Sequence, residues 1–371
     1  MSGEILVIGG GLAGAAAAAH LARAGRQVTL VERERGPHDK VCGEFLAPQA
    51  QLSLEELGID IATLGAAPIA CVRLAAGDDV IERQLPFPAV GLPRRVLDEA
   101  VLRRAGDCGA DIRRGCRVVA LSRSDSGWQA RLDSGEIMTA RTVVLATGKH
   151  DLRGFRRPAG LHRDLVGFRQ HFTLSTSQAA ALGGSVELAL FSGGYAGLQP
   201  AGEGRANLCL VVRGGVLLRL GSWPALLEAI AAEVGLLAKR LDGAVACGAR
   251  PSAVASIPYG AVRWRAGGLW RVGDQAAVMP SFAGEGMALA LRSAELAAAM
   301  LCRGMTPEAF QRRLAMAAAP RVVGASVLSH LLVAPAGQRI AMVLGRLCPP
   351  LLSGTARATR LPLLTESGFV T

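Results

Sequence analysis

Aromatic residues, lysines and organised cysteine patterns are all scarce in this sequence. Aromatic residues make up 4% of the 371 residues and apolar residues 50%, so we expect a core built mainly from alanine, valine and leucine. Only three lysines occur (Lys40, Lys149 and Lys239), so arginine carries most of the net charge of +11. The arginines are spread along the chain without a nucleic-acid-binding motif, and we therefore expect no nucleic-acid partner.

The cysteines lack any spacing typical of a metal site or a redox pair. None forms a C-x-x-C pair or a Cys/His ligand set, which argues against a zinc ribbon and predicts no metal. Most lie inside apolar runs, as reduced core cysteines do. They are Cys42, Cys71, Cys108, Cys116, Cys209, Cys247, Cys302 and Cys348.

The chain also lacks a basic leader and a long uncharged apolar run. Met1 to Glu4 lead directly into an apolar segment, and no uncharged run reaches the roughly 18 residues of a transmembrane helix. These features predict a cytoplasmic protein without a transmembrane segment. The apolar tail at 322–352 fits either a helical cap on the core or a peripheral membrane contact.

The N-terminal segment predicts a strand, a glycine turn and a helix in direct succession. Apolar residues 5–8 are followed by G-x-G-x-x-G, in which Gly9 allows a tight turn and Gly11 removes the Cβ that would face a pyrophosphate. Gly14 lets the alanine-rich helix 15–24 lie close on the strand. The backbone of Leu12 and Ala13 then opens the helix, where free N–H groups attract phosphate.

A second apolar strand, 28–31, ends in Glu32 and Arg33. An acidic residue about 20 residues after the glycines is placed to bind ribose hydroxyls. Strand, glycines, helix, second strand and terminal acid together predict a dinucleotide-binding site.

The remaining pattern predicts an α/β fold: a discontinuous Rossmann-type FAD-binding domain with an inserted antiparallel-sheet substrate domain and a C-terminal helical region. Helices are expected at 47–57, 94–106, 224–241 and 286–302, with strands at 116–122, 128–132, 137–140, 142–146, 165–174, 186–191, 206–212 and 269–273. The tail is expected to be helical, with breaks at Pro320, Pro335, Pro349 and Pro350. The predicted cofactor domain comprises 1–64, 92–153 and 259–302, the substrate domain 65–91 and 154–258, and the helical region 303–371.

Two further motifs carry a resemblance to a known family. Gly273-Asp274 ends a strand, and Pro280, Gly284, Glu285, Gly286 and Met287 then form P-x-x-x-G-x-G at the start of a long helix. With the glycine turn, this order resembles the flavoprotein superfamily of para-hydroxybenzoate hydroxylase, the aromatic monooxygenases and the geranylgeranyl reductases. The resemblance implies bound FAD, with Asp274 on its ribityl chain.

The same resemblance places the start of the helix at Gly286 against the pyrimidine edge of the flavin. Two-electron reduction leaves negative charge there, which a helix N-terminus stabilises. The strand end Ala146-Thr147-Gly148 and Val118 are also expected at the cofactor. Hydroxylases of this type carry Asp-Gly at the strand end, so the different sequence here puts their way of binding NAD(P)H in doubt.

Two segments resemble the reductase branch. Cys42-Gly43 resembles the Cys-Gly segment near the flavin of geranylgeranyl reductases, and Arg94, with Leu97 and Asp98, resembles their FAD-contacting helix. By contrast, residues 194–200 match only part of the Y-x-W-x-F-P segment of prenyl reductases. The apolar wall that this segment offers to an isoprenoid is therefore reduced.

Three side chains are candidates for catalysis: Tyr195, Cys42 and His171. Tyr195 follows two glycines in a sheet expected to cover the flavin, where a phenol could donate a proton. Strand alternation places His171 with Arg169 on the face opposite Phe168, and a histidine exposed to solvent is the simpler expectation.

These observations predict an FAD-dependent oxidoreductase, with NAD(P)H as a transient reductant because no second G-x-G-x-x-G is present. The first expectation is a monooxygenase that hydroxylates an aromatic or polyketide-type small molecule with O2. The alternatives are a reductase of alkene bonds in an isoprenoid or lipid and a flavin-binding partner protein without turnover.

Overall fold

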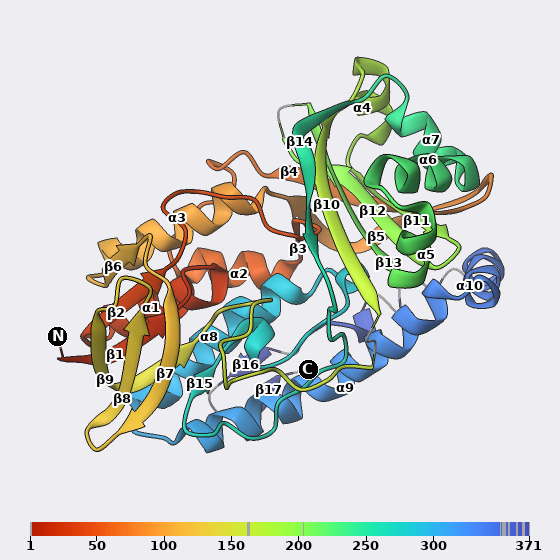
Figure 1. Cartoon of the computed structure of the whole chain (residues 1–371). Helices are drawn as coiled ribbons and strands as arrows, with labels where there is room; N and C mark the ends of the chain where they lie inside the picture. The colour runs from red at the N-terminus through yellow and green to blue at the C-terminus, as the bar shows by residue number, and fades with distance from the viewer. Residues whose placement is uncertain are drawn as a thin grey trace.

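The computed structural model describes residues 2–161, 164–202, 204–348, 350, 354, 357–360, 363–365 and 368–370. Two large sheets, each with its own helices, are joined by several crossings of the chain, and two long helices run along one side (Figure 1).

The first sheet has the strand order β6-β2-β1-β9-β8-β7, with β15 beside β9. Its parallel centre is β1 (Ser2–Ile8) between β2 (Val28–Glu32) and β9 (Ile137–Leu145). The other strands are β6 (Asp111–Arg114), β7 (Val118–Ser124), β8 (Gly127–Leu132) and β15 (Trp270–Arg271).

Both faces of β1 are buried, which explains its uninterrupted apolar sequence. Ile5 and Val7 pack with the helices α1 (Leu12–Arg23), α3 (Arg94–Asp107) and α8 (Gly286–Cys302). Leu6 and Ile8 pack on the opposite side, with Trp128 and other residues of the β7–β8 hairpin. The short helix α2 (Pro48–Glu56) contacts α8.

The second sheet has the order β14-β10-β13-β12-β11-β4-β5-β3. All neighbouring strands are antiparallel except β11 and β4, which are parallel. The strands are β3 (Phe45–Leu46), β4 (Ala67–Ala76), β5 (Asp79–Gly91), β10 (Leu165–Thr173), β11 (Ser185–Phe191), β12 (Gly194–Pro200), β13 (Arg205–Arg213) and β14 (Val245–Val254). The helices of this region are α4 (Thr176–Leu182), α5 (Gly214–Leu220), α6 (Trp223–Glu233) and α7 (Gly235–Leu241).

The C-terminal part contains α9 (Pro307–Val333), α10 (Pro335–Leu347) and the hairpin of β16 (Leu363–Thr365) and β17 (Gly368–Val370). Two 3₁₀ turns, η1 (Gly273–Gln275) and η2 (Ser281–Ala283), precede α8. The predicted fold class is confirmed.

Several predicted element boundaries were wrong. Helix α9 continues through Pro320, because a proline removes only its own N–H and the carbonyl left without a partner belongs to the half-exposed Met316. The predicted helix 224–241 is two helices, which are separated by the extended backbone of Val234. The two strands expected within 137–146 are one strand, and β12 and β14 were missed. Pro349 lies outside the described residues.

Candidate functional site

A cavity of about 1080 Å³ lies between the two sheets. One wall consists of the carboxyl ends of β1, β2 and β9, together with the starts of α1 and α8. The opposite wall consists of residues of β10, β13 and β14, namely Gly167, Cys209, Leu210, Val211, Ser252, Ala253 and Val254. Open α/β sheets bind ligands at this edge, and the volume reaches the upper end of the roughly 300–1,000 Å³ of small-molecule sites.

The glycine turn after β1 has the backbone geometry that its sequence predicts. Gly9 has a φ of +105°, and a Cβ there would lie 2.5 Å from the carbonyl oxygen of Ala146. A Cβ on Gly14 would overlap the carbonyl oxygen of Gly9. Gly9 and Gly11 line the cavity, whereas Gly14 does not. Gly14 therefore serves the close packing of α1 on the strand.

Glu32 is buried at the end of β2 and reinforces this turn. Its Oε2 accepts a hydrogen bond from the Gly10 N–H at 2.6 Å, and its Oε1 accepts one from the Glu34 N–H at 2.9 Å. Glu32 and Arg33 both line the cavity. The carboxylate is thus held in one orientation beside the expected ribose site.

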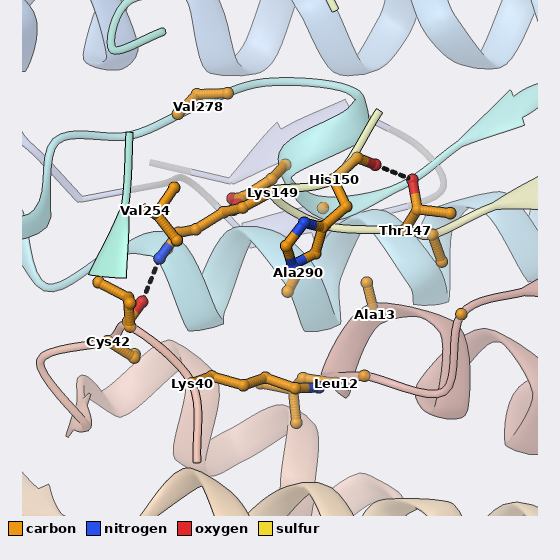
Figure 2. Close-up of a pocket in the computed structure, with 18 of the residues that line it drawn as sticks. Leu12, Ala13, Lys40, Cys42, Thr147, Lys149, His150, Val254, Val278 and Ala290 are labelled. Carbon is orange, nitrogen blue, oxygen red and sulfur yellow. Dashed lines mark hydrogen bonds between the residues drawn. The ribbon is translucent and has the colours of Figure 1, made fainter. Parts of the chain in front are cut away.

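Two cations lie beside the start of α1. Lys40 Nζ is 2.7 Å from Asp98 Oδ2, and Arg94 Nε is 2.7 Å from Asp98 Oδ1. Burial opposes ionisation of Asp98, but Arg94 and Lys40 outweigh it and hold its pKa below the usual value. Figure 2 shows Lys40 extended alongside Leu12. An anion at this helix start would therefore meet both backbone N–H groups and positive side chains.

The strand end after β9 forms a second part of the wall. Ala146, Thr147 and Gly148 line the cavity, and Thr147 Oγ1 donates a hydrogen bond to the carbonyl oxygen of His150 at 2.6 Å. Lys149 Nζ donates to the carbonyl oxygen of Val41, and Figure 2 shows the Lys149 side chain pointing toward Cys42. Burial, followed by the positive charge of Arg33, lowers the pKa of His150, so the imidazole is neutral at pH 7.

The start of α8 forms the third part. Asp274, Pro280, Gly284, Gly286 and Met287 all line the cavity, as do Gly273 and Val118. Gly284 has a φ of +67°, which favours glycine, and a Cβ on Gly286 would meet nothing within 4 Å. Glu285 differs from the prediction: it is fully buried, does not line the cavity and lies 3.4 Å from Arg360.

The two tyrosines of the chain lie together, but only one faces the cavity. Tyr195 is buried behind the wall, with its hydroxyl 3.2 Å from Ser281 Oγ, whereas Tyr259 and Ser281 line the cavity. Burial raises the pKa of both phenols, so both remain protonated at neutral pH. Tyr259 was missed because its sequence context contains no motif. The cluster therefore keeps a protonated phenol, that of Tyr259, at the cavity.

The predicted catalytic residues Cys42 and His171 occupy different positions. Cys42 lines the cavity, but His171 is buried outside it. The expectation of a solvated histidine was wrong, because His171 Nε2 lies 2.8 Å from Oε2 of the fully buried Glu44. Arg169 donates to Glu44 Oε1 at 2.9 Å and to Asn207 Oδ1 at 3.0 Å.

This buried network holds the loop that carries Cys42. Asn207 Nδ2 donates to the carbonyl oxygens of Cys42 and Gly43 at 2.9 and 3.0 Å, and Glu44 has a φ of +61°. Such a backbone conformation in a non-glycine residue persists only where its surroundings enforce it. We conclude that β10 and β13 position Cys42 at the cavity through Glu44, Arg169 and Asn207.

The residues present fit a flavin dinucleotide. Gly148 and Gly286 line the cavity at positions where a Cβ would meet nothing within 4 Å. Two helix N-termini open into the cavity, and Lys40 and Arg94 supply positive charge for a diphosphate. Two acidic residues, Glu32 and Asp274, lie at separate points where hydroxyl groups could be bound.

Comparison with known proteins supports this assignment. The family model "FAD binding domain" matches residues 3–150. Menaquinone reductase of Mycobacterium tuberculosis is 30% identical over 318 residues, which cover 81% of this chain and 76% of the relative. Digeranylgeranylglycerophospholipid reductase 2 of Methanopyrus kandleri is 30% identical over 58% of this chain and 56% of the relative.

Solved structures share the fold at lower identity. The flavin-dependent brominase Bmp2 is 16% identical and covers 100% of this chain and 96% of its own, with a TM-score of 0.79. PqsL of Pseudomonas aeruginosa, a probable FAD-dependent monooxygenase, is 19% identical and covers 92% of this chain and 100% of its own, with a TM-score of 0.74.

Proposed function

Because the chain belongs to the FAD-dependent oxidoreductase superfamily of para-hydroxybenzoate hydroxylase and the geranylgeranyl reductases, we propose that it is a flavin-dependent reductase of a lipid with a polyprenyl chain. The observation that carries the proposal is the 30% identity to menaquinone reductase over 81% of the chain. The similarity to digeranylgeranylglycerophospholipid reductase 2 supports the same substrate class, because geranylgeranyl groups offer C=C bonds for reduction. The proposal reverses the order of our two sequence-based expectations.

The cavity has a wall suited to an apolar tail. Val41, Leu210, Val211, Val254 and Ile257 line it on the side of the second sheet. Burying a hydrocarbon chain against such a wall stabilises it by about 0.8 kcal/mol for each buried CH₂ group.

We assign the cofactor contacts from the same lining. Gly9, Gly11, Lys40 and Arg94 would hold the diphosphate, Glu32 the nearby ribose and Asp274 the ribityl chain, with the start of α8 at the ring. When bound, FAD supplies hydride transfer to and from carbon. NAD(P)H is the proposed source of reducing equivalents.

Alkene reduction also needs a proton at the second carbon. Tyr259 is the proposed donor, because its protonated phenol lines the cavity together with Ser281, and Tyr195 lies behind them. Cys42 is a second group at the cavity that can carry a proton. The buried Glu44 network holds it there.

The test is an anaerobic turnover by the FAD-loaded protein. The flavin is reduced with dithionite and mixed with menaquinone whose prenyl tail is fully unsaturated. The products are reoxidised in air before mass spectrometry, so that reduction of the quinone ring is reversed and only hydrogenation of the tail is detected. We expect a gain of two hydrogen atoms in the tail, and recovery of unaltered menaquinone would contradict the proposal.

A second candidate is a monooxygenase acting on an aromatic or polyketide-type small molecule with NAD(P)H and O2. The fold shared with PqsL over 92% of this chain favours it. Stopped-flow mixing of the reduced holoprotein with O2 separates the two candidates. A C4a-hydroperoxide absorbance that persists with aromatic substrate analogues, followed by a product that has gained one oxygen atom, would favour the monooxygenase.

A further inference from the structure

The outward face of helix α10 is apolar, which is unusual for a helix on the surface of a protein. Gln338, Met342 and Gly345 form its buried face. The opposite face of such a helix normally carries polar residues. Here that face instead presents Ile340 and Leu347, whose exposed fractions are 58% and 79%.

The exposed apolar residues continue onto the adjoining end of α9. Val327 and Leu331 lie one helical turn apart in the last two turns of α9, and α10 begins directly after the bend at Ala334. Figure 1 shows α10 at the end of α9, at the edge of the molecule. We define the docking face as Val327, Leu331, Ile340, Val343, Leu344 and Leu347, all of which are exposed.

We infer that the docking face binds the surface of an anionic lipid bilayer. The charge of the surrounding sequence supports this partner. No Asp or Glu occurs between Glu308 and Glu366, whereas seven arginines do. Arg339 and Arg346 belong to α10 and are exposed beside the apolar residues, and Arg346 also pairs with Asp79 at 2.5 Å. A helix with an apolar face flanked by arginines is typical of segments that lie in the membrane interface.

The docking face is rigidly attached to the protein. Gln338 Nε2 donates to the carbonyl oxygens of Phe191 at 2.7 Å and Leu332 at 2.8 Å, which ties the start of α10 to β11 and to α9. A preformed face loses little conformational entropy when it binds. The exposed apolar residues are therefore already held together before the protein meets a membrane.

Apolar packing connects the inner side of α9 and α10 to the wall of the cavity. Leu332, Val333 and Met342, on the inner side of the two helices, share one apolar cluster with Tyr259, Ile257 and Val278. The last three residues line the cavity. The two helices that carry the docking face thus pack on the cavity wall with their inner sides. The inference about the membrane does not rest on the proposed substrate.

Helix α9 is better suited to contact a membrane from its surface than to span it. Among the described residues, α9 is the one single helix that is long and apolar enough to span a bilayer, yet 44% of its most apolar window is buried in the protein. It packs against α8, β12 and β15 as part of the fold. Only its outer side is available to lipid.

The test is co-sedimentation of the FAD-loaded full chain with vesicles. The vesicles consist of phosphatidylcholine alone or of phosphatidylcholine with phosphatidylglycerol. We expect tighter binding to the anionic vesicles and weaker binding at high salt, because each arginine near an anionic surface contributes about fivefold to the affinity. The variant Ile340→Asp/Leu347→Asp should bind at least about tenfold more weakly.

Ile137→Asp is the matched control, because Ile137 is 53% exposed on β9, at the other end of the molecule in Figure 1. It should bind as the wild type does, and all variants should keep their FAD and melting temperature. Wild-type protein that stays in the supernatant with both vesicle types overturns the inference, as does a double variant that binds normally. A wild-type dimer that the double variant converts to a monomer, without vesicle binding, would assign the face to a second copy of this chain.

Discussion

Replacing Glu44 with glutamine should destabilise the protein strongly, although Glu44 lies outside all the helices and strands that the sequence predicts. Glu44 is fully buried and accepts hydrogen bonds from Arg169 and from the Arg94 N–H, while His171 lies at its second oxygen. Removing one partner of a buried ion pair costs about 3–5 kcal/mol, because the remaining charge is left without compensation. Arg169 keeps one counter-ion, because Asp39 Oδ2 lies 3.1 Å from it. We therefore expect the free energy of unfolding to fall by the lower end of this range, about 3 kcal/mol.

The assay is urea unfolding of Glu44→Gln followed by circular dichroism and by release of FAD. The matched control is Glu82→Gln, since Glu82 also pairs with an arginine, Arg73 at 2.6 Å, but is half exposed. Exposed pairs contribute about 0–1 kcal/mol. Equal unfolding midpoints for the two variants would refute the network as the support of this loop.

Three further predictions concern the glycine turn, the cofactor and the pH dependence of stability. Gly14→Ala should abolish FAD binding, because the new Cβ would overlap the carbonyl oxygen of Gly9. The control is Gly36→Ala, since a Cβ on Gly36 would meet nothing within 4 Å. Titration of both variants with FAD tests this prediction. Asp274→Ala should weaken FAD retention, and unchanged occupancy after dialysis would argue against the ribityl assignment. Burial, followed by Arg23 and Arg292, lowers the pKa of His20 to about 4. The unfolded chain, with a histidine pKa of about 6.5, therefore binds the extra proton first, and stability should fall by about 3 kcal/mol as the pH drops from about 6.5 towards 4. His20→Gln should remove most of this slope in urea unfolding measured across that range, and an unchanged slope would contradict the assignment.

The sequence alone determined the parts of the site in which the backbone itself carries the constraint. The turn between β1 and α1 requires positions without a Cβ within a few residues of each other, so Gly9, Gly11 and Gly14 are readable as a local motif. The start of α8 at Gly286 was predictable for the same reason, since the glycines and Asp274 precede an uninterrupted helical pattern.

Only the tertiary structure decided which side chains from distant segments meet at the cavity. His171 is buried because Glu44, 127 residues earlier, lies against it, and strand alternation could give its face but not what covers that face. Tyr259 faces the cavity and Tyr195 does not, because the packing of β12 against η2 and α9 encloses Tyr195. Burial and electrostatic pairing depend on contacts between segments far apart in the chain, and a local pattern does not contain them.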